Sequence, residues 1–346
     1  MDKILFIVET PFQLLSAMEA KNYFHNYKSV LLIRYFPERT SSLNNNQIKK
    51  MLTLTEWFYI ETIECNLSTK ISNYKLFFYM KKLQKKYTTF DKIFIGEYRS
   101  WIHRKYLEIL NPKESFLLDD GSVSIEMQKN YLPKYKNYFE DTNLMSRLDR
   151  TLRTVMFKLL DIRERKLNIN LFTCFDLLPY SNQQKIINHQ FDFSKKLLKR
   201  KAILSKTVYF FGSPLSEVAL ISEEYELDLL NKIVQRFKNN QMQLVYLPHR
   251  REKKEKLDKI TNRFNVELRI SKYPAEIEFI MMESIPSCIA SFYSTTLISI
   301  PKIVNFKEII SFQLDYTQIN SDCVESIQNT YDYYKEKLEV IDINES

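Results

Sequence analysis

Short apolar runs alternate with longer stretches of helical periodicity along most of the chain. In the first half, five runs rich in β-branched and aromatic residues have the length of strands: Lys3–Val8, Ser29–Arg34, Trp57–Ile63, Lys92–Gly96 and Ser115–Leu118. The amphipathic segments Phe12–Tyr27 and Tyr74–Lys86 lie between them. This alternation is typical of a mostly parallel sheet covered by helices, so we predict a Rossmann-like α/β unit.

The same alternation returns after about residue 206. Predicted strands there are Thr207–Phe211, Gln243–Leu247, Glu267–Ile270, Ser287–Ser291 and Lys302–Asn305, with helices over Glu223–Asn239 and Ala275–Glu283. Between about Ser122 and Lys206 the pattern is helical, basic and less regular. We therefore expect a Rossmann-like domain over residues 1–155, a helical connecting segment over 156–205, and a Rossmann-like domain over 206–346 that includes a C-terminal helix. The two doubly wound domains are expected to face each other across a cleft.

Composition agrees with this organisation. The 346 residues suffice for two cores, and 45% apolar with 27% charged residues is ordinary for a globular protein. No apolar run is long enough to span a bilayer, and the first residues lack the features of a signal peptide, so we expect a cytoplasmic location. The four cysteines are far apart and form no CxxC pair, which indicates buried free thiols and no metal site.

The net charge of +9 calls for an acidic partner without identifying it. Nucleic acid, anionic lipid, a nucleotide-sugar and a polyanionic glycan all qualify. Lysine clusters occur in Ser194–Lys206 and Arg250–Lys259, where helical spacing would place several charges on one face; such faces are most often simply solvated. Because the chain has no recognisable nucleic-acid-binding signature, nucleic acid is the weaker reading.

Only three glycines occur, Gly96, Gly121 and Gly212, and each follows a predicted strand. Glycine tolerates positive φ and a close approach of backbone or ligand. In doubly wound sheets, ligands bind at the carboxyl ends of the strands. We therefore expect that the backbone at these three positions either adopts a positive φ or is closely approached by other backbone or by a ligand.

Two adjacent carboxylates, Asp119 and Asp120, precede Gly121 at the end of a strand. Neighbouring side chains of an extended segment point in opposite directions, so one carboxylate can face a cleft while the other braces the loop. One general base is all that an inverting sugar transfer requires. An ordinary turn would have the same composition.

His249 lies between Pro248 and Arg250 at the end of another strand. Arginine and protonated histidine both suit phosphate oxygens. The other histidines, His25, His103 and His189, lie in helical or mixed segments, and we expect structural or surface roles for them.

Hydroxyl side chains gather at Ser294 and Thr295, where a strand meets a predicted helix. Such a junction can bind an anion, although helix capping alone would select the same residues. The chain contains no D-x-D triplet, P-loop, GxGxxG or GxSxG motif. The pattern favours stabilisation of a leaving group without a metal.

Seven short motifs occur in the order and approximate spacing of a known family: Thr10-Pro-Phe-Gln13, Asp119-Asp120-Gly121, Leu178-Pro179-Tyr180, Gly212-Ser213-Pro214, Pro248-His249-Arg250, Ser271-Lys-Tyr-Pro-Ala-Glu276 and Phe292-Tyr-Ser294. They resemble the bacterial sialyltransferases of GT-B architecture. The resemblance is closest to glycosyltransferase family 52, the lipooligosaccharide sialyltransferases, with the bacterial polysialyltransferases as relatives.

The resemblance implies an inverting, metal-independent transfer of sialic acid from CMP-sialic acid, with no further cofactor, onto lipooligosaccharide or capsule. It implies that His249 stabilises or protonates the departing phosphate, and that Ser294 and Thr295 bind it. Glu276 would take the ribose hydroxyls. The remaining donor-side residues implied are Gly212, Ser213, Pro214, Pro248 and Arg250, and those implied for the acceptor side are Gln13, Gly121 and Glu217.

This sequence departs from the family in two places. The family histidine is followed by proline, whereas here proline precedes it. The family also places an aspartate directly after Gly-Ser-Pro that resembles a general base, and Leu215 stands there. We therefore expect Asp120 or Asp119 to serve as the base, with Glu217 in reserve.

Two other readings stay open. The donor could be another CMP-linked nonulosonic acid, CMP-Kdo or a nucleotide-hexose. Outside catalysis, a module that binds nucleic acid or anionic membrane would also explain the charge. For the enzyme we expect a glycan or glycolipid acceptor, peripheral contact with the inner face of the cytoplasmic membrane, and a homodimer as one possible assembly.

Overall fold

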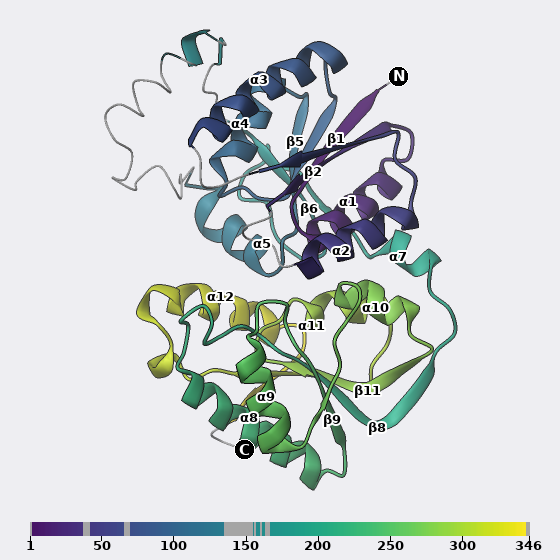
Figure 1. The fold of residues 1–346 in the computed structure, drawn as a ribbon, viewed down its shortest axis with the longest axis vertical. Coiled ribbons are helices and arrows are strands. Elements are labelled where there is room, and N and C mark those ends of the chain that lie inside the picture. The colour runs from purple at the N-terminus through teal and green to yellow at the C-terminus, as the bar shows by residue number, and fades with distance from the viewer. Residues whose placement is uncertain are drawn as a thin grey trace. The chain divides into compact units, whose positions relative to one another are not determined.

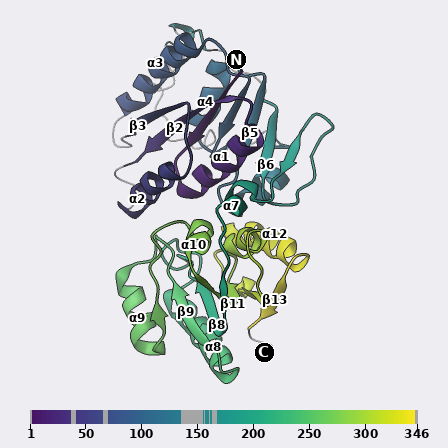
Figure 2. The ribbon, with the colours of Figure 1, turned by 90° about the vertical axis from the view of Figure 1, so that its right-hand side faces the viewer.

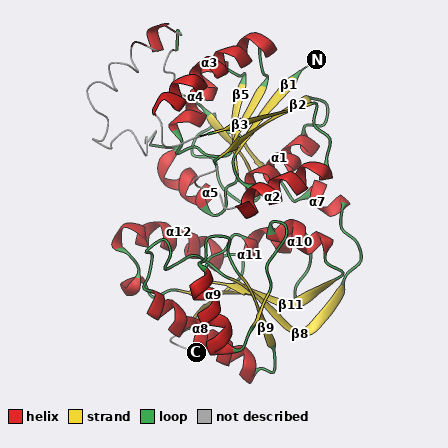
Figure 3. Cartoon of the chain, in the orientation of Figure 1, coloured by secondary structure: helices red, strands yellow, loops and turns green. Residues whose placement is uncertain are grey.

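The computed structural model describes residues 2–36, 42–65, 70–134, 155, 157–159, 161–162 and 167–343. The chain divides into two compact units, Met1–His189 and Gln190–Ser346. Figure 1 shows the helices and strands of both units, and Figure 3 marks the parallel sheet inside each. None of the helices in the described ranges is long and apolar enough to cross a bilayer.

The first unit is built on a parallel sheet whose described strands run in the order β3-β2-β1-β4-β5-β6-β7. Their bounds are β1 Lys3–Val8, β2 Lys28–Tyr35, β3 Tyr59–Glu64, β4 Lys92–Ile95, β5 Glu114–Leu118, β6 Ile169–Thr173 and β7 Ile186–Asn188. Its helices are α1 Pro11–Tyr23, α2 Ser42–Met51, α3 Lys70–Tyr87, α4 Trp101–Leu110 and α5 Val123–Glu126. The direction of winding changes between β1 and β4, which is the position where doubly wound sheets bind ligands.

Both faces of the first sheet are buried, as the continuous apolar strands require. Leu5 and Ile7 of β1 pack in one core with side chains of α3 and α4, such as Phe77 and Tyr106. The alternate residue Phe6 points to the other face and stacks on Phe94 at 4.8 Å between ring centroids. Figure 2 shows helices on both sides of this sheet.

The second unit contains a second parallel sheet, with its described strands in the order β10-β9-β8-β11-β12-β13. The strands are β8 Ala202–Phe211, β9 Gln243–Leu247, β10 Glu267–Leu268, β11 Ser284–Ser291, β12 Glu308–Gln313 and β13 Glu339–Asp342. The helices are α7 Asp192–Lys196, α8 Glu223–Asn239, α9 Lys254–Phe264, α10 Ala275–Met281, α11 Thr296–Ser299 and α12 Val324–Lys335. Here the winding changes between β8 and β11.

The helices of the second unit also cover both faces of its sheet. Leu229 and Ile233 of α8 pack in one core with Phe210 of β8. The next residue, Phe211, faces the other way and lies against Phe279 of α10, with ring centroids 5.9 Å apart. The prediction of two Rossmann-like α/β units is therefore confirmed.

The predicted connecting segment is where the structure differs most. Residues 156–205 were expected to be helical, but they include β6 and β7, which complete the first sheet, so the first unit extends to His189. The reason is that all five residues of β6 are buried between the helical layers of the sheet. The basic stretch Ser194–Lys206 likewise runs from the end of α7 through the loop 197–201 into the start of β8, so its charges share no helical face.

One predicted strand of the second unit is wrong. Residues 302–305 follow a short 3-10 turn over Ile300–Lys302, and the strand β12 begins later, at Glu308. Ile303 and Val304 are buried without joining the sheet. Their apolar character therefore reflects packing beneath the turn rather than a strand.

Candidate active site

Three loops of the second unit leave the sheet side by side. Phe211, at the end of β8, pairs with Leu247 on one side and with Ser291 on the other. The loops that start at Gly212, Pro248 and Phe292 therefore begin on neighbouring strands, at the point where the winding changes. The sheet brings together the three donor-side motifs that the sequence places far apart.

Hydrogen bonds at the strand ends hold these loops in register. The Gly212 amide donates to the Leu247 carbonyl at 2.8 Å, and the Ser291 hydroxyl donates to the Phe211 carbonyl at 2.7 Å. Two independent bonds thus fix the start of the Gly212 loop relative to its neighbours. The site is framed by backbone that belongs to the sheet.

The imidazole of His249 is oriented by its own loop. Its Nδ1 accepts a hydrogen bond from the Arg251 amide at 3.1 Å, so the hydrogen of the neutral ring is on Nε2. Burial, reinforced by the charges of Arg250 and Arg251, lowers the pKa of His249 to about 3. The ligand-free ring is consequently a neutral N–H donor at pH 7, whereas the sequence suggested an imidazolium.

A buried carboxylate, Glu252, lies behind His249. One oxygen accepts from the His249 amide at 2.5 Å, and the other accepts from the Tyr246 hydroxyl at 2.7 Å. A Cβ on Gly212 would overlap both Glu252 and Tyr246. Gly212 is therefore required by a close approach within the protein itself, and sequence reasoning identified the glycine without identifying Glu252.

Lys256 lies at the centre of three carboxylates and is only 2% exposed. Its ammonium is 2.7 Å from Glu226, 2.9 Å from Glu217 and 3.0 Å from Glu252. Burial disfavours its charge, but the carboxylates, Glu252 first, raise the pKa of Lys256. Burial in turn raises the pKa of Glu252 to about 7, against the opposing pull of Lys256. Lys256 belongs to the basic run Arg250–Lys259, so this run is not simply a solvated face.

The reserve base, Glu217, is already engaged. It accepts a hydrogen bond from the Lys253 amide at 2.9 Å in addition to its ion pair with Lys256. Although burial opposes the effect, these contacts lower the pKa of Glu217. Leu215, which replaces the family aspartate, is fully buried in the core. This loop therefore offers a poor general base.

Ser294 and Thr295, the two predicted hydroxyl residues of the site, lie between β11 and α11. The Ser294 Oγ accepts from the Thr296 hydroxyl at 2.8 Å. The hydroxyl of Tyr334, on α12, lies 2.8 Å from the Ser294 carbonyl and 3.1 Å from the Tyr293 carbonyl. No local pattern in the sequence marks this distant tyrosine as a support of the loop.

Glu276 is placed at the start of α10 and is 3% exposed. Its carboxylate accepts a hydrogen bond from the Ser299 hydroxyl of α11, and burial raises the pKa of Glu276. In the ligand-free unit this side chain therefore joins α10 to α11.

In the first unit, the structure separates the two aspartates. Asp119 is 1% exposed and accepts two hydrogen bonds at 2.6 Å, from the Ser124 hydroxyl and from the Cys174 amide. Asp120 is half-buried and accepts from the Thr10 hydroxyl at 3.0 Å. Gly121 has a φ of 80°, which explains its glycine. As the alternation predicted, one carboxylate braces the loop, and Asp120 is the more exposed of the two.

Gln13 departs from the cleft position that was expected. It is 1% exposed, and its side-chain oxygen accepts from the Glu9 amide at 2.7 Å. A Cβ on Gly96 would overlap this side chain. Gln13 and Gly96 together shape the loop after β1, which also holds Thr10 against Asp120.

The other histidines have the roles predicted for them. His103 is fully buried, with Nε2 2.8 Å from Glu9, while His25 is exposed. His189 is 4% exposed and stacks on Phe172, with ring centroids 4.9 Å apart.

Among the described residues, one group of three buried side chains could share a metal ion. Oxygen, sulfur and nitrogen atoms of Asp119, Cys174 and His189 lie within 4.8 Å of one another. Zinc accepts all three ligand types. However, both Asp119 oxygens already accept hydrogen bonds that hold its loop. The group is therefore explained by loop packing, and independence from metal stays a prediction.

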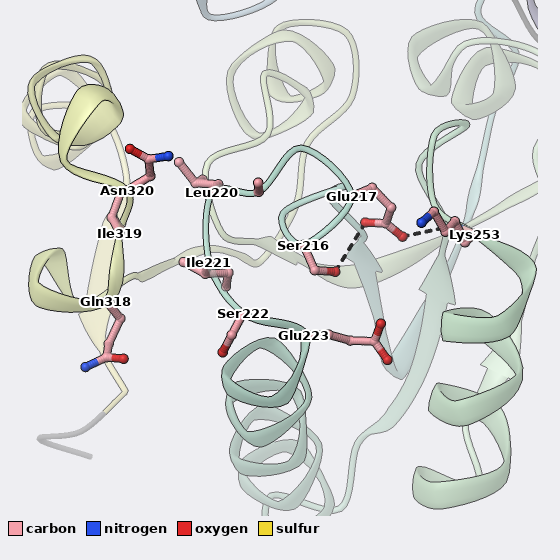
Figure 4. Close-up of a pocket in the computed structure, with 11 residues that line it drawn as sticks. Ser216, Glu217, Leu220, Ile221, Ser222, Glu223, Lys253, Gln318, Ile319 and Asn320 are labelled. Carbon is pink, nitrogen blue, oxygen red and sulfur yellow. Dashed lines mark hydrogen bonds between the residues drawn. The ribbon is translucent and has the colours of Figure 1, made fainter.

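A cavity of about 580 Å³ opens beside the Glu217 loop of the second unit (Figure 4). It is lined by the segment from Ser216 to Glu223, by Lys253 and by residues 318–320. Of the sequence-predicted site residues, only Glu217 lines it. The cavity is thus bordered by the far end of the loop after β8, and the Gly212-Ser213-Pro214 motif, His249 and Ser294 do not line it.

Two solved structures share the fold of the whole chain. The α/β-galactoside α-2,3-sialyltransferase of Photobacterium phosphoreum is 13% identical, with a TM-score of 0.50, and the match covers 100% of this chain and 99% of that one. The UDP-GlcNAc 2-epimerase of Neisseria meningitidis bound to UDP-GlcNAc is 11% identical, with a TM-score of 0.52 and coverage of 99% and 95%. No curated protein matches the sequence.

The sequence itself carries the family assignment. The model of glycosyltransferase family 52 matches residues 53–315, which is well over half of the chain. The match includes both the Asp119-Asp120-Gly121 loop and the three donor-side loops. Together with the two parallel sheets, it shows that this chain belongs to glycosyltransferase family 52 and is a glycosyltransferase of the GT-B fold.

Proposed function

We propose that the enzyme transfers sialic acid from CMP-sialic acid to a bacterial surface glycan, with inversion and without a metal. The observation that carries the proposal is the position of His249, whose Nε2–H is the free end of a ring oriented through Nδ1. It lies in the loop after β9, beside the Gly212 loop, which is itself next to the Ser294 loop. A nucleotide phosphate needs donors converging from several elements in this way.

In the donor complex, the phosphate accepts a hydrogen bond from His249 Nε2 and from the hydroxyls of Ser294 and Thr295. Arg250 adds a positive charge beside the ring. The backbone of Gly212, Ser213 and Pro214, and the ring of Pro248, border the nucleotide. Glu276 takes the ribose hydroxyls by exchanging its bond to Ser299. These donors replace the metal that would otherwise neutralise the leaving group.

The reaction is a single displacement. The acceptor hydroxyl attacks the anomeric carbon from the face opposite the phosphate, and Asp120 takes the hydroxyl proton. The bond between the anomeric carbon and the phosphate oxygen breaks, and CMP leaves with the electron pair. Asp120 is suited to this step because it is half-buried, while Asp119 holds the loop.

The similar solved structures support the donor class. One is a sialyltransferase, and the other is bound to the nucleotide-sugar UDP-GlcNAc. The enzyme class also argues against a purely binding module as the explanation of the +9 charge.

The test is a donor panel with product analysis. The purified protein is incubated with galactose-terminated oligosaccharides and with CMP-sialic acid, CMP-Kdo or UDP-glucose, and products are identified by mass spectrometry. We expect a sialylated product only with CMP-sialic acid, together with release of CMP. Transfer from CMP-Kdo or from UDP-glucose alone would replace the proposed donor with one of the alternatives.

The acceptor class follows from the charge. A protein with a net charge of +9 is attracted to anionic lipid surfaces, and lipid-linked glycans are assembled at such surfaces. We propose lipooligosaccharide or capsule precursors at the inner face of the cytoplasmic membrane as the acceptor. We expect the protein to co-sediment with vesicles that contain phosphatidylglycerol. Salt at about 0.5 M should reverse this binding, because it screens the attraction between the charges. Absence of binding at low salt would contradict it.

A further inference from the structure

A buried group of charges connects the two loops that flank the donor site. We name Lys256, Glu217, Glu226 and Glu252 the Lys256 hub. The side chains of Lys256, Glu226 and Glu252 are at most 1% exposed, and that of Glu217 is 8% exposed. Burying four charges is costly, and apolar residues of similar size would often stabilise a core better. Stability alone therefore does not explain why these four ionisable residues are buried together.

The bonds of the hub end on backbone atoms of the donor-side loops. Lys256 donates to the Ser213 carbonyl at 3.2 Å, within the loop after β8. Glu252 accepts from the His249 amide at 2.5 Å, within the loop after β9. Because Lys256 and Glu252 are themselves 3.0 Å apart, one ion pair links the two loops directly.

Shape reinforces this link. The carboxylate of Glu252 occupies the space where a side chain at position 212 would be, so it lies directly against the Gly212 backbone. Glu226, from α8, completes the arrangement by accepting from the Ser216 amide at 3.1 Å and from its hydroxyl at 2.6 Å. Each carboxylate of the hub thus accepts a hydrogen bond from a different backbone amide of the two loops: Glu252 from His249, Glu226 from Ser216 and Glu217 from Lys253.

We propose that Lys256 and Glu252 are positioning residues that fix the Ser213 loop and the His249 loop relative to each other, so that both reach one nucleotide phosphate. This rests on the proposed function of the two loops in binding the donor. Neither side chain touches the donor. They preorganise the two loops for donor binding, which reduces the conformational entropy that is lost when the donor binds.

The decisive variant is Glu252→Ala, with Glu252→Gln as the conservative partner. Alanine removes the acceptor of the His249 amide and leaves Lys256 balanced by two carboxylates, so the fold is retained. Glutamine has the same length but replaces one acceptor oxygen by an NH2 donor, so it can accept from the His249 amide while losing the ion pair with Lys256. We expect Glu252→Ala to raise the Kd for CMP about tenfold and to lower kcat/KM for the donor by at least as much, and Glu252→Gln to lie between Glu252→Ala and wild type.

Lys256→Met removes the other half of the link, and Lys259→Met is its matched control. Lys259 is on the same helix and pairs with Glu223 of α8, but this pair is exposed. We expect Lys256→Met to match Glu252→Ala and Lys259→Met to match wild type. If Lys256→Met fails to fold, Glu252→Ala still decides the question.

Hydrogen exchange of the ligand-free protein separates this proposal from the donor assignment. Faster exchange in residues 212–217 and 248–253 of Glu252→Ala, with the strands unchanged, supports the hub whatever nucleotide binds. If wild type ignores CMP and binds UDP, the donor is corrected and the affinity comparison is made with UDP. A Glu252→Ala protein that loses thermal stability while its nucleotide Kd, kcat/KM and loop exchange equal those of wild type would overturn the proposal.

Discussion

Asp119 and Asp120 show how two adjacent carboxylates acquire different tasks. The pleat points them in opposite directions, and the buried partners of Asp119, Ser124 and the Cys174 amide, fix the direction of Asp120. The chemical difference between them is therefore one of surroundings and not of residue type.

Replacing Asp120 by Asn should remove the proton acceptor while preserving shape. We expect kcat to fall by about 10²–10⁴-fold, the usual contribution of a general base, with an unchanged melting temperature. Asp119→Ala is the contrasting variant, because it leaves two buried donors unsatisfied and should cost about 2–5 kcal/mol of unfolding free energy. Steady-state kinetics and urea denaturation measure the two effects. An Asp120→Asn enzyme with wild-type kcat would remove this residue from the mechanism.

The lowered pKa of His249 has a signature in stability. Between its unfolded value of about 6.5 and its folded value of about 3, the unfolded chain binds a proton that the folded chain does not, so acidification destabilises the fold. The His249→Gln variant lacks this proton. Between pH 7 and pH 5, the wild type should lose about 2 kcal/mol more of its unfolding free energy than the His249→Gln variant loses. Urea denaturation at both pH values measures it, and a gap independent of pH would show that His249 is not buried as described.

At the scale of elements, the close approach of Glu252 to Gly212 couples the loop after β8 to the loop after β9. Gly212→Ala would force Glu252 and Tyr246 to move. We expect weaker CMP binding, measured by calorimetry, and a stability loss of about 1–3 kcal/mol, as for other overpacked sites. Gly96→Ala is the control, because its clash with Gln13 lies in the first unit and should leave CMP affinity unchanged. Equal effects of both variants on CMP affinity would contradict this assignment.

Elements with complete local signals were predicted well. Helix α8 matches its predicted range because Ser222 caps it, acidic residues follow, and the apolar spacing is regular. Strands β1 and β9 also match, since their apolar runs are bounded by polar loops. By contrast, β6 is short and lies in a basic, irregular stretch, so nothing local distinguishes it from the helical surroundings that were expected.

The same division holds for the site. Asp120 and His249 are marked by strand ends and turn residues, which are local features. Lys256 and Tyr334 contact partners that are distant in the sequence, such as Glu226 and Ser294. No local sequence pattern indicates these pairs, because only the folded arrangement of strands and helices brings them together. The sequence therefore located the loops but not the side chains that hold them.

For the whole molecule, the metal question has a direct test. We expect transfer to be unchanged after dialysis against EDTA, because hydrogen-bond donors of the second unit neutralise the leaving group. The metal content of the purified protein should be well below one ion per chain. Activity lost with EDTA and restored by Mg²⁺ or Mn²⁺ would contradict the proposed mechanism. Zinc at one equivalent, removable without loss of activity, would instead assign a structural site to Asp119, Cys174 and His189.

Two units with separate cores also explain why the domain boundary was misplaced. The first sheet includes β6 and β7, which lie beyond the predicted boundary at residue 155, so the end of the unit is set by tertiary pairing and not by a change in composition. The boundary lies at His189, whose own ring stacks on Phe172 of β6.

The hydroxyl of Tyr334 ties the final helix to a loop 40 residues earlier. A protein trimmed before this position would still contain every side chain expected to touch CMP, and sequence inspection would judge it competent. Its Ser294 turn, however, would have lost an anchor from outside the sheet. Shortened versions made for crystallisation should accordingly keep Tyr334, and proteolytic cleavage before this residue should abolish activity without removing a single ligand contact.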